Sequence, residues 1–424
     1  MKNNIYFLLI VTFVLASCLS MNVKITKTAN EYPNSLSIKL VNGNWFNGKT
    51  FENKTVWVNN GILSFKNKNT KIDTTIDITS KYVIPPFGEA HNHNLENDYK
   101  IDDAISKYLN NGVFYVKMLS SIKKRIDIIK DKFNKPESVD VSYAHAPLTG
   151  SGGHPIKLRE TFFDMGRFKG VFNSKKEIEG HGYFIIDTKK DLDTKWPAII
   201  SQSPDFIKIM ILWSEEYAKR KDDTAYFGQK GLNPLLVPDI VQKAHAQGLR
   251  VSAHVESAYD FHIAVTAGVD EIAHMPCIEK VEQLNSSDIA LAKKNETIVV
   301  TTVSLVEKYK NHTEYDSLVD NLKKILLLLK NAGVKIAVGS DIFTDNSHKE
   351  AALLNQWGIF TNLELLKMWC ENSAMTTFPN RKIGYLKEGY EASFLVLGSN
   401  PLNDMNEINQ SIILKVKQGM ILAE

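Results

Sequence analysis

Cysteine is scarce in this chain, with 3 among 424 residues. Cys18 closes the N-terminal apolar run, which leaves only Cys277 and Cys370 for the folded part. An oxidising compartment would allow one disulfide between these two. Because they belong to unrelated segments, we expect instead two separate buried thiols.

An excess of charge of either sign is lacking as well. The chain has 51 Lys and Arg against 48 Asp and Glu, a formal net charge of +3, with no basic stripe. Nucleic acid is therefore excluded as an expected partner, since its binding depends on concentrated positive charge. We expect a small-molecule substrate, and the oligomeric state stays open. Hydrophobic residues make up 43%, enough for one large core and a small satellite module.

The first residues are set apart by an apolar run. Lys2 precedes "IYFLLIVTFVLA", which is too short to span a membrane comfortably, and "LASC" follows. This pattern predicts a bacterial lipoprotein, with a signal peptide over 1–17, lipid on Cys18 and a tether over 18–35. The alternative is an ordinary signal peptide with an incidental cysteine. No acidic retention residue follows Cys18, which favours an outer-membrane anchor facing the periplasm, although that rule differs between bacterial groups.

Periodicity divides the rest of the chain into two kinds of segment. Residues 36–81 and 376–424 read as short strands, in the first case with Asn-Gly turns, and predict a small split β-sandwich domain formed by both ends of the chain. Over 82–375, β-branched runs alternate with helix-like stretches, several of which end in Gly. Eight such repeats predict an α/β fold, a (β/α)8 TIM barrel. The expected strands lie near 82–87, 113–118, 139–145, 205–211, 249–254, 269–273, 297–303 and 334–340.

Two long excursions, 146–204 and 212–236, follow predicted strand ends. In a barrel of this kind the active-site loops lie on that face. Trp213 and Tyr226, on the second excursion, are candidates to bind substrate, or they pack the loop. The run "KRK" at 219–221 would attract an acidic group or would form a solvated face.

Six polar residues each follow a predicted barrel strand or lie within it. Strands of a parallel barrel deliver such side chains to one mouth, and imidazoles, a carboxylate and a lysine there suit metal ions. Alone, each signal is weak: an H-x-H pair occurs on surface loops, His254 and His274 could be core histidines, and Asp341 could cap a helix. The joint occurrence favours a metal site. The six residues are His91, His93, Lys208, His254, His274 and Asp341.

Lys208 decides the type of site. In "FIKIMI" it shares a strand face with Phe206 and Met210, and that face is expected to point into the barrel. Burial of an unpaired ammonium lowers its pKa toward the neutral amine. A neutral amine can add carbon dioxide and become a carbamate, which can bridge two cations. The alternative is an ion pair with Asp205 or a loop carboxylate.

These motifs resemble those of the amidohydrolase superfamily, in its binuclear branch with a carboxylated lysine. The resemblance covers nearly the whole mature chain and includes the ending "KIGYLKEGYEASFLVLGSNPL". It is closest to the imidazolonepropionase-like and Xaa-Pro-dipeptidase-like group, with "FIKIM" for the strand of Lys208 and "GSGGHP" for the loop of His154. Two departures are "PPFGEAHNH", without the usual Ile-Asp, and Ser393 in place of a common Asp. Neither touches a predicted ligand, but both weaken any transfer of substrate.

The resemblance implies a role for each residue. His91, His93 and Asp341 would hold one metal, His254 and His274 the other, and carbamylated Lys208 would bridge them. Four imidazoles and oxygens suit two Zn ions and tolerate other divalent metals. A bridging hydroxide would attack the substrate, with Asp341 as the acid and base. His154 would stabilise the oxyanion or hold the substrate.

The sequence therefore predicts a metal-dependent hydrolase of amide or peptide-like C–N bonds. Within enzymes, the alternatives are a mononuclear deaminase or cyclic-amidine hydrolase, and a hydrolase of esters, lactones or organophosphates. From another class, the chain could be an inactive surface binding lipoprotein. No motif in the two excursions indicates which substrate is bound.

Overall fold

The computed structural model describes residues 37–67, 71–406 and 408–423. The predicted signal peptide, Cys18 and the tether lie outside these residues. Within them, no helix combines the length and the apolar character needed to cross a bilayer.

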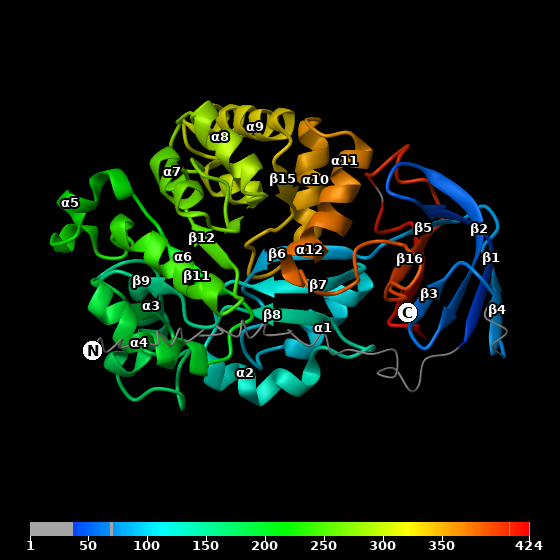
Figure 1. Cartoon of the computed structure of the whole chain (residues 1–424), viewed down its shortest axis with the longest axis horizontal. Coiled ribbons are helices and arrows are strands. Elements are labelled where there is room, and N and C mark those ends of the chain that lie inside the picture. The colour runs from blue at the N-terminus through cyan, green and yellow to red at the C-terminus, as the bar shows by residue number, and fades with distance from the viewer. Residues whose placement is uncertain (1–36, 68–70, 407, 424) are drawn as a thin grey trace, which may run out of the picture.

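Strands from both ends of the chain share one mixed sheet, drawn in blue and red at the right of Figure 1. Its order is β18-β17-β16-β5-β1-β2-β3, with β4 also paired to β1. A register shift between Leu40 and Gly43 lets β1 pair with β4 before it and with β5 after it. The expected sandwich strands thus form one branched sheet. The bounds are β1 Ile38–Phe46, β2 Phe51–Asn59, β3 Ile62–Ser64, β4 Thr74–Asp77, β5 Tyr82–Ile84, β16 Phe394–Leu397, β17 Ile412–Lys417 and β18 Met420–Ile421.

The predicted strand near 82–87 is two strands. Tyr82–Ile84 belongs to the mixed sheet, whereas β6 (Phe87–Asn92) begins the parallel part of the molecule. Pro85 and Pro86 separate them, because proline has no N–H to give to a ladder. The boundary between the two parts therefore falls at these prolines and not at residue 82.

The remaining strands are parallel and form two sheets, β6-β7-β8 and β10-β9-β11-β12-β13-β14-β15. Backbone hydrogen bonds join the sheets on both sides: Ala90 N donates to Val338 O at 3.0 Å, and Asp205 N donates to Tyr143 O at 2.9 Å. The seven predicted strands after the first are confirmed, most of them with shorter ends, and two strands that were not predicted, β9 and β10, lie in the excursion 146–204. The bounds are β7 Val113–Met118, β8 Asp140–Tyr143, β9 Leu148–Thr149, β10 Phe184–Ile185, β11 Ile207–Met210, β12 Val251–His254, β13 Glu271–Ile272, β14 Ile298–Val300 and β15 Lys335–Ala337.

Helices lie between these strands (Figure 1). In α9, Leu322, Leu326 and Leu329 are buried at helical spacing, and the helix ends where Gly333 adopts φ 73°, a conformation that glycine tolerates. The α-helices are α1 Ile101–Asn110, α2 Lys123–Ile129, α3 Ile156–Asp164, α4 Lys189–Ser201, α5 Tyr217–Arg220, α6 Val237–Ala246, α7 Ala258–Ala267, α8 Ser286–Lys294, α9 Tyr315–Ala332, α10 Ser347–Trp357, α11 Asn362–Lys367 and α12 Ser373–Thr377.

Alternation along β11 separates two environments, as the sequence predicts. Ile207, Ile209 and Ile211 belong to the large core that packs against the helices. Phe206 belongs to a small interior cluster with Leu119, and Lys208 shares its face. Cys277 and Cys370 are both buried and free, so the prediction of separate thiols is confirmed.

Candidate metal centre

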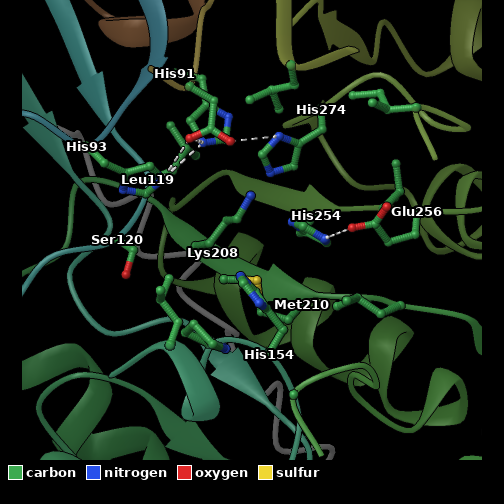
Figure 2. A pocket seen from close by; sticks show the side chains of 18 of the residues that line it. His91, His93, Leu119, Ser120, His154, Lys208, Met210, His254, Glu256 and His274 are labelled. Carbon is green, nitrogen blue, oxygen red and sulfur yellow. Dashed lines mark hydrogen bonds and ion pairs between the residues drawn. The ribbon is translucent and has the colours of Figure 1, made fainter. Parts of the chain in front are cut away.

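A cavity of about 540 Å³ opens at the carboxyl ends of the parallel strands. All six predicted metal ligands line it, together with His154 and Trp213. Figure 2 shows Lys208 between the wall of His91 and His93 and the wall of His254 and His274. Segments more than 200 residues apart in sequence therefore meet at one mouth.

His91, His93 and Asp341 form the tightest group. The two imidazole Nε2 atoms are 3.3 Å apart, and Asp341 Oδ1 lies 3.5 Å from Nε2 of His91 and 3.3 Å from that of His93. Within the described residues these three side chains are the ones whose ligand atoms all fall within 4.8 Å of one another.

The other ring nitrogens of this group are already engaged. His91 Nδ1 donates to Ala273 O at 2.7 Å, and His93 Nδ1 donates to Glu96 Oε1 at 2.5 Å. Burial lowers the pKa of His91 well below its usual value, so this ring is neutral and carries a lone pair on Nε2. Although burial opposes it, the charge and hydrogen bond of Glu96 and the charge of Asp341 raise the pKa of His93. The lone pair of His91, the ring of His93 and the carboxylate of Asp341 thus face one space, in which a metal would take the place of a proton on His93. This donor set fits a divalent metal.

Asp341 is held in place by its backbone. Its N–H donates to His91 O at 2.8 Å, and its φ of 53° lies in the left-handed region, which costs a non-glycine residue free energy. The N-cap of the next helix, α10, is Asn346, whose side chain accepts from His348 N. The alternative role of Asp341 as a helix cap is therefore wrong.

Lys208 has no hydrogen-bond partner for its buried Nζ. Asp205, the proposed ion-pair partner, accepts instead from Tyr143 N at 2.8 Å. Burial lowers the pKa of Lys208 to about 7, against the opposing attraction of Glu271 and Asp341. A neutral, unpartnered amine between two groups of histidines is the state that carbamate formation requires, although the modification itself stays a prediction.

The second pair of predicted ligands is less tightly drawn together. The rings of His254 and His274 have centroids 4.5 Å apart, and His274 Nδ1 lies 3.5 Å from Asp341 Oδ2. His254 Nε2, however, is directed at Glu256 Oε1, 2.9 Å away. Burial, together with the charge of Glu279, raises the pKa of Glu256 to about 8, so this acid is largely protonated at neutral pH and can donate to His254.

The predicted substrate residues divide. His154 stacks on His254 with ring centroids 5.2 Å apart, and burial lowers its pKa well below the usual value. Trp213 lines the cavity. Tyr226 is not among the lining residues, so the prediction that it lines the pocket is wrong. Its ring packs on the Arg220 guanidinium, whose central carbon lies 4.6 Å from the centroid of the ring. Arg220 lies between Tyr226 and the pocket because it also covers Trp213 at 4.9 Å.

Other charged residues of the cavity escaped the sequence analysis. They lie on loops, helices or a 3-10 turn, where no strand-end pattern marks them, although Arg159 and Arg220 fall inside the two excursions considered above. Glu96 could have been found, because it lies three residues after His93 in the same loop. The charged lining residues missed or left undecided are Glu96, Arg159, Arg220, Glu256, Glu279 and Lys308.

Comparisons with known proteins agree with this site. Residues 223–422 match the profile of the Amidohydrolase family. Ochratoxinase of Aspergillus niger is 28% identical over 249 residues, which cover 56% of this chain and 50% of the relative. The match thus spans about half the length of that curated relative.

Solved structures share the fold over most of the chain. The crystal structure of A. niger ochratoxinase superposes with a TM-score of 0.69 at 20% identity, covering 91% of this chain and 95% of that one. A Xaa-Pro dipeptidase with bound methionine gives 0.70 at 16% identity, covering 92% and 100%. The chain is therefore similar to amidohydrolases over residues 223–422 and shares the fold of these solved structures over most of its length, in agreement with the resemblance seen in its motifs.

Proposed function

We propose that this protein is a metal-dependent hydrolase of amide or peptide-like C–N bonds. The observation that carries the proposal is the convergence of His91, His93 and Asp341 beside the unpartnered Nζ of Lys208. Ochratoxinase and a Xaa-Pro dipeptidase are similar to the chain, and both are named for hydrolysis. The lone amine favours the binuclear reading over a mononuclear deaminase, in which Lys208 would have no role.

We further propose that the two parallel sheets close into one (β/α)8 barrel beside a split domain, which the sequence placed at 36–81 and 376–424 and which β5 extends to Ile84. The proposal is supported by the backbone hydrogen bonds that join the sheets on both sides. It is also supported by the similarity to superfamily structures over nine-tenths of the chain. Closure would bring the carboxyl ends of β6 and β15 together, as the ligand set requires.

His91, His93 and Asp341 would hold one divalent cation, and His254 and His274 a second, with Zn as the expected ion. Lys208 would bridge them after its neutral Nζ attacks carbon dioxide, forming an N–C bond and releasing one proton. When bound, the two cations supply a water-derived nucleophile at neutral pH and polarise the scissile carbonyl.

Three side chains of the cavity would carry out proton transfer, substrate binding and the exclusion of water. Burial raises the pKa of Asp341, which suits it to take a proton at its carboxylate and to return it to the leaving nitrogen. His154 is neutral, because burial lowers its pKa, so its ring N–H can donate to the substrate without adding charge. Trp213 lines the cavity and would restrict water there.

The test is to count metals and to assay hydrolysis on the same protein. Metal-loaded wild type should bind two equivalents and should release amine from a dipeptide or an N-acyl amino acid, and a chelator should remove both properties. Lys208→Ala should bind one equivalent or less, and short carboxylic acids with bicarbonate should restore part of the activity. A fully loaded and fully active Lys208→Ala protein would refute the bridging role, and turnover of lactones alone would refute C–N hydrolysis.

We also propose that the chain is exported as a lipoprotein, with a signal peptide over 1–17, lipid on Cys18 and a location at the outer membrane facing the periplasm. The support is the sequence pattern "LASC". Cys18→Ser should leave the precursor uncleaved. A mature protein that starts at another residue and carries no lipid would contradict the proposal.

A further inference from the structure

Arg159 is a buried cation of the cavity that the described residues neutralise only in part. Arg159 lies on α3, five residues after His154, and is only 5% exposed. Its Nη2 donates to Ser120 Oγ, and its Nη1 lies 3.6 Å from Glu96 Oε2, beyond hydrogen-bond distance. Its buried Nε has no hydrogen-bond partner. Because a guanidinium has five N–H donors, most of this group's capacity is unused.

Within the part of the chain that the structure describes, Arg159 forms its ion pair with Glu96, and this carboxylate is already shared. Glu96 accepts from His93 Nδ1 at 2.5 Å, so its charge also serves the ring of a predicted metal ligand. Burial of a cation costs free energy when its N–H donors lack acceptors and when it shares its counter-ion with another group. An anion that enters the cavity would complete its partners.

The other two peripheral cations of the cavity differ from Arg159 in this respect. Arg220 donates from Nε to Glu216 at 2.7 Å and from Nη1 to Gln229 O at 2.8 Å. Lys308 is paired with Glu279 at 2.7 Å. Both are satisfied within the chain, which singles out Arg159 as the group with free capacity.

The position of Arg159 indicates which part of a substrate it would meet. Glu96 links it to His93, and the His93 ring lies 3.3 Å from Asp341 Oδ1. Arg159 is therefore on the side of the cavity where Asp341 would return a proton to the leaving nitrogen. In an N-acyl amino acid, the α-carbon bonded to that nitrogen carries the carboxylate, and the planar pair of carboxylate oxygens matches the guanidinium fork.

We propose that Arg159 is the specificity-determining anchor for a carboxylate on the leaving-amine side of the substrate. This inference rests on the proposed hydrolase function and narrows it. The substrates are N-acyl amino acids or peptides with a free carboxyl terminus, in contrast to uncharged amides, ureas and lactones.

The experiment uses two substrates that differ only at the anchored group, N-benzoyl-L-phenylalanine and its carboxamide, with benzoate release as the readout. Wild type should prefer the acid. Arg159→Met should lower kcat/KM for the acid roughly 10- to 100-fold, the loss expected when a hydrogen bond to a charged group is removed. The carboxamide should be affected little, and Arg159→Lys should recover part of the preference. Arg220→Gln, the matched control at a satisfied arginine, should leave the acid-to-amide ratio unchanged.

Binding separates failure of this inference from failure of the proposed function. The acid should raise the melting temperature of the metal-loaded wild type and not that of Arg159→Met, even if neither compound is hydrolysed. Equal losses on acid and carboxamide, together with lower metal content, would show that Arg159 only supports Glu96 and His93, and would overturn the anchor. An equal change of ratio in Arg220→Gln would also overturn it, because general positive potential would then explain the preference.

Discussion

The two walls of the cavity differ in how far hydrogen bonds already orient their predicted metal ligands. On one wall, His91 and His93 are each fixed through Nδ1, and their free Nε2 atoms face Asp341 within 3.5 Å. On the other wall, His254 is directed at Glu256, and Lys208, which lies between the walls, has no hydrogen-bond partner for its Nζ. Figure 2 shows the dashed contact that joins His254 to Glu256, and no such line reaches Lys208.

The difference shows what the chain can organise alone. Backbone and carboxylate acceptors orient the first wall, so its ligand atoms converge before any ligand is present. If the proposed carbamate forms, the second metal site would also depend on an anion at Lys208 that comes from carbon dioxide and not from the twenty amino acids. We therefore expect the first metal to bind more tightly than the second, and the predictions below test that expectation.

The largest effect is expected at the junction of the walls. Asp341→Asn keeps an oxygen but removes the base, so turnover of the metal-loaded protein should fall roughly 10²–10⁴-fold, the range that general acid–base groups supply. The melting temperature should change little, because the substitution is nearly isosteric. Both quantities are measured on the same preparation.

Asp345→Asn is a suitable control. This residue lies on the same loop but pairs with the surface Lys107, so its loss should leave turnover unchanged. Near-wild-type turnover of Asp341→Asn would remove Asp341 from the chemistry and leave it as a ligand alone.

The sequence could predict the six ligands because each belongs to a strand or follows one. Parallel strands end at the same edge, so His91 and Asp341 could be brought together without knowledge of any contact. Glu96 and Arg159 could not be found in this way. Their places depend on how the loop after β6 and the helix α3 fold back over the cavity, and such packing leaves no periodic signal. For the same reason Tyr226 was misplaced, since nothing in its sequence shows that Arg220 lies between it and the cavity.

The small domain shows the same limit. Period-two alternation predicted its strands, but not the bulge between Leu40 and Gly43 that makes β1 branch to two partners. The double proline after β5 was visible in the sequence, and it marks the boundary between the two parts better than the apolar run around it does.

A smaller effect is expected from the support of the first wall. Glu96→Ala removes the acceptor of His93 Nδ1–H, so affinity for the first metal should fall roughly 10- to 100-fold, as when other supporting partners of a ligand are lost. Glu96→Gln keeps an acceptor and should recover part of the loss. Metal titration of the apoprotein with a competing chelator gives both values.

Glu256→Ala is the matched change on the second wall. It frees His254 Nε2, so affinity for the second metal should stay the same or rise. If both substitutions weaken metal binding by a similar factor, the hydrogen bonds of the two walls orient their ligands equally well. The proposed difference between the walls would then be refuted.

The smallest effect is expected in the pH dependence of activation, which follows the rate at which Lys208 adds carbon dioxide. The pKa of Lys208 is lowered to about 7, and only the neutral amine adds carbon dioxide. Below this pKa the ammonium predominates and loading is slow; above it the amine is free. At fixed dissolved carbon dioxide, the initial rate of activation of the apoprotein by metal should therefore rise about tenfold between pH 6 and pH 8, following the neutral fraction.

An ordinary lysine would still be mostly protonated at pH 8, so its rate would keep rising well beyond that pH. Stopped aliquots assayed for activity after addition of metal and bicarbonate measure this profile, and a rate that does not level off near pH 8 would show that Lys208 is not prepared for the carbamate.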